Sequence, residues 1–312
     1  MFYKINKKII ISYIFIFLAI LFFTKYVWTN FVEIKNIEFV FKPVFLFISF
    51  FLWCISYSGY SFIWRRILIS IDKNITISKT SSFKMYILTE FSKYIPGSVW
   101  SVFARTYFSN KLNTQKRHIL TASAIDAILA AITILALGSF FLILHFSTTH
   151  LFLILIASGI SIFGFILLHP KIFYFVSNFV LEKMGREKIH LDFMLSYKKI
   201  IYFSLQYIFL NIIQSISFYI LIISITTISL EHFFLISASF CLGIGLGIMA
   251  FFAPSGLGVR EGVMTYLLSI IISSPISAFI AIISRLWMTV GEVFLLSFAI
   301  LLEKIQRLKK KE

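Results

Sequence analysis

Residues 251–262, FFAPSGLGVREG, interrupt a long apolar part of the chain. One apolar run leads into a proline, three glycines and the adjacent Arg260 and Glu261, and a further apolar run follows them. Proline removes a backbone donor and ends a helix, whereas glycine permits turns and close approach of backbones. The stretch therefore predicts a broken helix at a place where both neighbouring segments favour lipid.

The composition of the 312-residue chain indicates a membrane protein. Hydrophobic residues make up 59% of it and charged residues 13%, compared with about 45–50% and about 25% in an average soluble domain. A chain of this length cannot bury that much apolar surface away from water, so a bilayer is the natural solvent. Cys54 and Cys241 both lie in apolar runs, and we expect no disulfide.

Apolar runs of the length that crosses a bilayer, roughly 20 residues, recur along the chain. We expect seven long membrane helices and one short apolar piece, over residues 9–28, 41–64, 119–146, 151–169, 200–224, 233–252, 263–272 and 276–302.

The distribution of basic residues predicts the orientation. The chain holds 29 Lys and Arg against 13 Asp and Glu, and the basic residues gather at the N-terminus, in 65–118, in 171–199 and in the C-terminal tail. Under the positive-inside rule these regions are cytoplasmic, which requires an even number of crossings. The excess of positive charge therefore needs no nucleic acid partner.

The predicted fold is an all-α polytopic membrane helix bundle with about eight crossings and two broken or re-entrant elements. Residues 1–312 form one transmembrane domain, which ends in a basic cytoplasmic tail over 303–312. Two related halves, 1–146 and 151–302, suggest a degenerate internal repeat, a feature common in transporters.

The first half contains a stretch that is similar in pattern to FFAPSGLGVREG. Residues 81–108 are apolar but include Pro96, Gly97 and Arg105. An acid on a long apolar helix follows each break, Asp126 in the first half and Glu292 in the second. Irregular backbone survives at membrane depth only when it is buried in protein or lines a wet cavity. We therefore expect a hydrated site where the two breaks meet.

The second break has the chemistry of an anion site. After Pro254, the glycines at 256 and 258 allow turns, and a helix that starts near Val259 would direct its N-terminal N–H groups at an anion. Arg260 adds a planar donor that suits phosphate or carboxylate. Glu261 either neutralises Arg260 or caps the helix.

Structural interpretations of the same charges stay open. Arg260 and Glu261 can pair with each other or with Asp126 or Glu292, and the two acids can serve as buried partners of arginines. The predicted helix over 200–224 carries polar residues at helical spacing, for which hydrogen bonding between helices is the simpler explanation than substrate contact. These residues are Tyr207, Asn211 and Gln214, followed by Phe218.

Three glycines in the predicted helix over 233–252 predict a packing face. Gly243, Gly245 and Gly247 lie in CLGIGLGIM, and no βαβ pattern that would indicate a dinucleotide site surrounds them. Residues 171–184 are typical of an amphipathic helix at the cytoplasmic surface.

Four motifs together resemble a known family. They are KYIPGSVWSVFARTYF (93–108), SAIDAIL (123–129), APSGLGVREG (253–262) and SRLWMTVGEVFLL (284–296). Their order and spacing are similar to those of the lysylphosphatidylglycerol synthase transmembrane family, which is flippase-like. The resemblance implies an eight-helix inner-membrane protein. In its best-understood relatives this module moves an aminoacylated phospholipid between leaflets.

The resemblance also implies site residues. The second motif carries Pro254, Gly256, Gly258, Arg260 and Glu261; the first carries Pro96, Gly97, Trp100 and Arg105; the last helix carries Arg285 and Glu292. Bifunctional relatives combine this module with an aminoacyl-transferase domain. We expect no such domain in this chain after residue 302. Ser255 also stands where many relatives have glycine.

The expected function is translocation of a lipid with an anionic phosphate head group, either a phospholipid or a polyprenyl-phosphate-linked sugar. Arg260 and Arg105 would receive the phosphate, while Asp126, Arg285 and Glu292 would balance charge or couple an ion. We expect no catalytic residue, metal or cofactor.

The expected location is the bacterial inner membrane with both termini in the cytoplasm. The expected partners are membrane lipids, envelope-biosynthesis glycosyltransferases and, in a homodimer, a second copy. A membrane-embedded glycosyl or lipid transferase and an accessory subunit of envelope polysaccharide synthesis stay as alternatives.

Overall fold

The computed structural model describes residues 41–94, 101, 104–110, 112, 114–146, 152, 155, 158–159, 162–164, 166, 169–183, 195–250 and 253–308. The prediction of an all-α membrane bundle is confirmed, because the described residues form helices and no strand. The helices are α3 (Pro43–Ile71), α4 (Lys79–Glu90), α6 (Lys116–Phe146), α8 (Pro170–Lys183), α9 (Tyr197–Ile225), α10 (Phe233–Met249), α11 (Val259–Leu268) and α12 (Ser274–Leu308). Short 3-10 turns are η1 (Phe91–Tyr94), η2 (Arg105–Phe108), η4 (Leu230–His232) and η5 (Pro254–Gly256).

Five of the described helical segments are long and apolar enough to cross a membrane: α3, α6, α9, α10 with its preceding turn, and α12. The predicted segments 9–28 and most of 151–169 lie outside the described residues, so the number of crossings and the internal repeat stay predictions. Many side chains on the outer faces of these helices are apolar and exposed, for example Phe47, Phe209 and Phe298. Such faces suit a lipid solvent.

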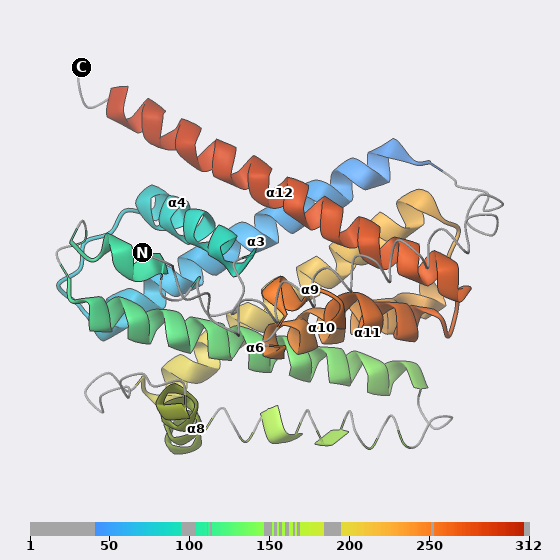
Figure 1. Cartoon of the computed structure of the whole chain (residues 1–312), viewed down its shortest axis with the longest axis horizontal. Helices are drawn as coiled ribbons and strands as arrows, with labels where there is room; N and C mark the ends of the chain where they lie inside the picture. Colours follow the sequence, from blue (N-terminus) through green and yellow to red (C-terminus); the bar gives the residue numbers. More distant parts are fainter. Residues whose placement is uncertain are drawn as a thin grey trace, which may run out of the picture.

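The bundle is built from helices that are distant in sequence (Figure 1). Helix α3 packs along α9, α6 packs along α10, and α12 contacts α3, α4 and α11. Small polar residues allow close approach. Ser49 of α3 and Ser217 of α9 exchange hydrogen bonds, each hydroxyl donating to the other residue's carbonyl at 2.9 and 2.6 Å. This packing brings α3, α6 and α9 together around the middle of the molecule.

Two helices, α3 and α12, extend beyond their apolar runs. Helix α3 continues to Ile71 and does not end at Trp64, so Arg65 and Arg66 lie within it. Arg65 donates to the carbonyl of Ile77 at 2.8 Å, and Arg66 to the hydroxyl of Tyr202 at 3.2 Å. Hydropathy marks where lipid ends, whereas a helix continues as long as its backbone can hydrogen-bond.

The short apolar piece forms a helix that is too short to cross a bilayer alone. Helix α11 begins at Val259, where the second break predicted a helix start, although the apolar run itself begins at 263, and it has 10 residues. At 1.5 Å per residue it spans about 15 Å, half of a hydrocarbon core of about 30 Å. It returns along α10: a Cβ at Gly243 would lie 2.8 Å from Met264, and one at Gly247 would lie 3.3 Å from Cβ of Arg260.

The glycines of α10 are confirmed as a packing face, and in fact they serve two faces. Gly243 and Gly247 face α11 and η5, while a Cβ at Gly245 would lie 2.5 Å from Leu135 of α6. A side chain at these positions would separate the helices. Helix α10 is therefore the element that holds the second broken helix against the rest of the bundle.

Candidate functional site

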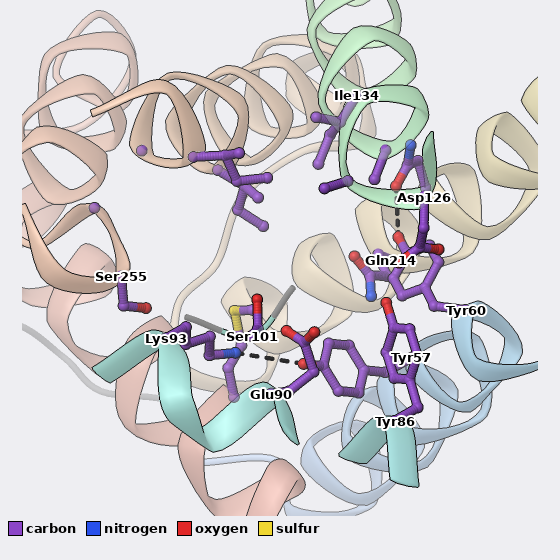
Figure 2. Close-up of a pocket in the computed structure, with 18 of the residues that line it drawn as sticks. Tyr57, Tyr60, Tyr86, Glu90, Lys93, Ser101, Asp126, Ile134, Gln214 and Ser255 are labelled. Carbon is purple, nitrogen blue, oxygen red and sulfur yellow. Dashed lines mark hydrogen bonds between the residues drawn. The ribbon is translucent and has the colours of Figure 1, made fainter. Parts of the chain in front are cut away.

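Both predicted arginines line one cavity of about 260 Å³ in the middle of the bundle. Figure 2 shows part of its lining, which comes from helices on both sides of the bundle. Basic and acidic side chains meet there: Arg105, Arg260 and Lys93 carry positive charge, and Glu90 and Asp126 carry negative charge. The expectation that the two breaks meet at a common site therefore agrees with the geometry.

Arg105 is held from several sides. Its Nη1 donates to Asp126 Oδ2 at 2.8 Å and its Nη2 donates to Glu90 Oε1 at 2.6 Å. The guanidinium also lies over the rings of Tyr86 and Trp64, 4.1 and 5.3 Å from their centroids. Only 2% of Arg105 is exposed. The first break thus contributes a buried, paired cation, as the structural interpretation of Asp126 anticipated.

Asp126 has a second partner on α9. The hydroxyl of Tyr207 donates to its other carboxylate oxygen, Oδ1. Four residues further along the same face of α9, Asn211 accepts a hydrogen bond from the hydroxyl of Tyr60 at 2.6 Å. The prediction of hydrogen bonding between helices is therefore confirmed for Tyr207 and Asn211, and these bonds fix α9 against α3 and α6.

The second break has a strained backbone. Ser255, Gly256 and Gly258 have φ angles of 50°, 65° and 86°, in the left-handed region that favours glycine. Gly256 approaches Gly247 so closely that a Cβ would lie 2.5 Å from the Cα of Gly247. These turns allow the chain to reverse after α10 and to start α11 beside the cavity.

Glu261 caps α11. Its Oε2 accepts a hydrogen bond from the backbone N–H of Gly258 at 2.7 Å, and its Oε1 pairs with Nη1 of Arg285 on α12. Arg285 also donates to the carbonyl of Ser255 at 3.4 Å. Of the two roles predicted for Glu261, capping is thus present, and Arg285 supplies a charge partner that the sequence did not identify.

Arg260 points across to α12. It is 7% exposed, and its Nη2 lies 3.2 Å from Oγ of Ser284 and 2.8 Å from Sδ of Met288. A hydroxyl and a thioether are neutral acceptors, and sulfur is a weak one. A phosphate oxygen that entered the cavity could replace either of them, because charge-assisted hydrogen bonds are about twice as strong as neutral ones.

Helix α12 also contacts the first break. Lys93 of η1 pairs with Glu292 and donates to the hydroxyl of Tyr57 at 3.3 Å. Helix α12 therefore holds each break with one charged side chain. Glu292 supplies a negative charge to the first break, and Arg285, seven residues earlier, supplies a positive charge to the second. A single helix thus connects both breaks electrostatically.

A comparison of the sequence with protein families gives one match. The model for the lysylphosphatidylglycerol synthase TM region covers residues 9–295. The chain belongs to this family. No curated protein and no solved structure matches the chain significantly. Membership of the lysylphosphatidylglycerol synthase TM region family places the chain among multi-pass membrane proteins in lipid-related processes.

Not every residue implied by the family resemblance can be placed. Pro96, Gly97 and Trp100 lie outside the described residues, and of Pro254 the backbone lies in η5. Among the described residues, no group of three or more His, Cys, Asp or Glu side chains could hold a metal ion.

Sequence reasoning missed the tyrosine-rich side of the cavity. Tyr57, Tyr60 and Tyr86 line it together with Glu90 and Gln214. The two tyrosines of α3 lie three residues apart in SYSGYS (56–61), within a run that was interpreted only as a membrane helix. Helical spacing alone could have placed them on one face, but nothing in the sequence indicates which neighbours that face meets.

Proposed function

We propose that this protein moves a lipid with an anionic phosphate head group between the leaflets of the bacterial inner membrane, without making or breaking a covalent bond. The observation that carries the proposal is the single cavity lined by Arg105 and Arg260, one from each break. Family membership supports a lipid as the cargo. We also propose that both termini are cytoplasmic, since the basic regions gather on one side of the expected topology.

In this proposal Arg260 receives the phosphate. Its guanidinium lies at the first turn of α11, where backbone N–H groups of a helix have no intrahelical acceptor and the helix dipole favours an anion. Arg105 contributes less, because Glu90 and Asp126 already offset its charge. The cavity reduces the cost of moving a charged head group through hydrocarbon, which for an isolated ion is prohibitive.

Helix α12 is the element that we propose couples the two breaks during transport. The cavity would open alternately to the two sides of the membrane. During this change, the ion pairs of α12 with Lys93 and with Glu261 can be exchanged for contacts with the head group or with water. The acids Asp126 and Glu292 keep the cavity from holding an excess of positive charge when it is empty.

The test is the movement of a fluorescent short-chain phosphatidylglycerol and of a short-chain polyprenyl-phosphate-linked hexose across proteoliposomes that contain the full chain. We expect Arg260→Gln to slow movement at least about tenfold, as the loss of one charge-assisted hydrogen bond predicts. Arg66→Gln, at an exposed position on α3, is the matched control and should move lipid as the wild type does. Equal rates for folded Arg260→Gln protein and wild type would contradict the proposal.

A further inference from the structure

The cavity has two chemically different sides. Figure 2 shows Tyr60, Tyr86, Gln214 and Asp126 gathered on one side, whereas Ser255 of the second break lies on the other. A phosphate bound at the second break would leave the tyrosine side for the group that the phosphate carries. The side chains on that side therefore indicate the chemistry of the group.

The tyrosine side offers hydrogen-bonding groups that the protein itself does not use. Gln214 lines the cavity and is 3% exposed, yet its carboxamide has no hydrogen-bond partner in the described part of the chain. The same holds, among those residues, for the hydroxyl of Tyr86, which is 7% exposed. Both groups border the cavity and are not among the fully enclosed side-chain atoms that lack a partner. Water or an occupant that both donates and accepts hydrogen bonds can therefore bind to them.

The charges on this side disfavour an ammonium group. Arg105 pairs with both Glu90 and Asp126 and offsets one of their two negative charges, while Lys93 lines the same cavity and adds a second positive charge. Arg105 also lies 4.1 Å from the centroid of Tyr86, and Lys93 lies 5.6 Å from that of Tyr57. Resident cations thus occupy the aromatic faces that would otherwise attract a cationic head group.

A second anion is disfavoured as well, because Glu90 and Asp126 border the same space. The remaining class is an uncharged polar group. With a volume of about 260 Å³, the cavity lies just below the usual range of ligand pockets, about 300–1,000 Å³. It therefore suits one small unit and not an oligosaccharide.

We infer that the tyrosine side of the cavity binds an uncharged, hydroxyl-rich group joined to the phosphate, such as a single sugar ring or a glycerol unit. Its hydroxyls can accept from and donate to the Gln214 carboxamide and the Tyr86 hydroxyl. The inference rests on the proposed function, because phosphate at Arg260 determines which side the attached group meets.

The experiment measures the affinity of the purified full chain, in detergent, for four matched probes by isothermal titration calorimetry. The probes are dodecyl methyl phosphate, dodecyl phosphoglycerol, dodecyl hexosyl phosphate and dodecyl phosphoethanolamine. We expect the better of the two hydroxyl-bearing probes to bind about tenfold more tightly than the methyl ester, as one or two hydrogen bonds predict. The probe that binds more tightly, hexosyl or glyceryl, identifies the source of the hydroxyl groups.

Two substitutions on the same helix separate a binding role from a structural one. Gln214→Leu should reduce the tenfold preference to about one, while Gln206→Leu, eight residues earlier on α9 and in contact with Arg66 at 3.3 Å, should keep it. Thermal unfolding of each variant verifies that it is folded. A preference that survives Gln214→Leu would overturn the inference.

The remaining outcomes distinguish this inference from the proposed function. Equal or tighter binding of the methyl or ethanolamine probe would overturn the inference alone, provided that Arg260→Gln still weakens all four probes. Absence of binding by every probe to the wild type would overturn the phosphate site and, with it, this inference.

Discussion

The two breaks place an arginine in the same cavity but surround it differently. Arg105 of the first break is bound by two carboxylates and lies against two aromatic rings. Arg260 of the second break donates to a hydroxyl and a thioether. The comparison shows that two similar sequence patterns can place one arginine between two carboxylates and the other against a hydroxyl and a thioether, and the proposed function assigns the ligand to the second.

The largest expected effect is on the first break. Arg105→Gln leaves Glu90 and Asp126 buried without their shared cation, which should destabilise the fold by about 3–5 kcal/mol. Thermal unfolding in detergent measures the loss, and adding Asp126→Asn should recover part of it. Arg260→Gln should cost less than half as much. If Arg105→Gln and Arg260→Gln lower stability equally, the contrast between the two arginines is wrong.

At the second break, stability should depend on the backbone conformation and on the close packing of Gly256. Gly256→Ala forces a side chain into a left-handed conformation and against the backbone of Gly247, and we expect a loss of about 2–4 kcal/mol. Gly262→Ala is the matched control, because a Cβ there meets nothing within 4 Å and alanine favours a helix by about 1 kcal/mol. The two variants should therefore shift the unfolding temperature in opposite directions. A shift in the same direction would show that the turn is not tightly packed.

In each ion pair of α12 the two side chains should be energetically coupled to each other. The two pairs should be independent of each other. Double-mutant cycles on unfolding, with Lys93→Gln and Glu292→Gln for one pair and Arg285→Gln and Glu261→Gln for the other, should each give about 1–3 kcal/mol. The cross-cycle between Glu292 and Glu261 should give less than about 0.5 kcal/mol. A cross-coupling as large as that within the pairs would mean that the breaks act as one unit.

The smallest expected effect is at Ser255. Its φ of 50° is left-handed, which costs a residue with a Cβ about 1–2 kcal/mol. Ser255→Gly should therefore raise stability, but only by up to about 1 kcal/mol, because the greater freedom of glycine in the unfolded chain offsets part of the relieved strain. A loss of stability would indicate that the Ser255 side chain makes a contact that outweighs the strain.

Much of this architecture could be predicted from local sequence. Long apolar runs predicted α6 and α9 within a few residues, because lipid requires internally hydrogen-bonded helices. Proline and glycine predicted the second break and, with it, the start of α11 near Val259. The ends of α3 and α12 were wrong because both helices continue into water after their apolar windows end.

Apart from Asp126 as the buried partner of an arginine, the pairings could not be predicted, since they join residues that are far apart in the chain. Lys93 and Glu292 meet only because α4, which leads into η1, packs against α12. Glu90 was not predicted as a partner of Arg105. Gln214 was interpreted as a helix-packing residue along with Tyr207 and Asn211. Only the tertiary arrangement shows that Gln214 and Asn211 both line the cavity, and that Asn211 and Tyr207 also bind neighbouring helices.

The most direct test of the shared cavity is an experimental structure of the full chain with dodecyl methyl phosphate bound. We expect a phosphate oxygen within about 3 Å of the Arg260 guanidinium, with Arg105 still bonded to Glu90 and Asp126. Phosphate bound outside the cavity, or Arg105 and Arg260 opening onto separate surfaces, would contradict the account.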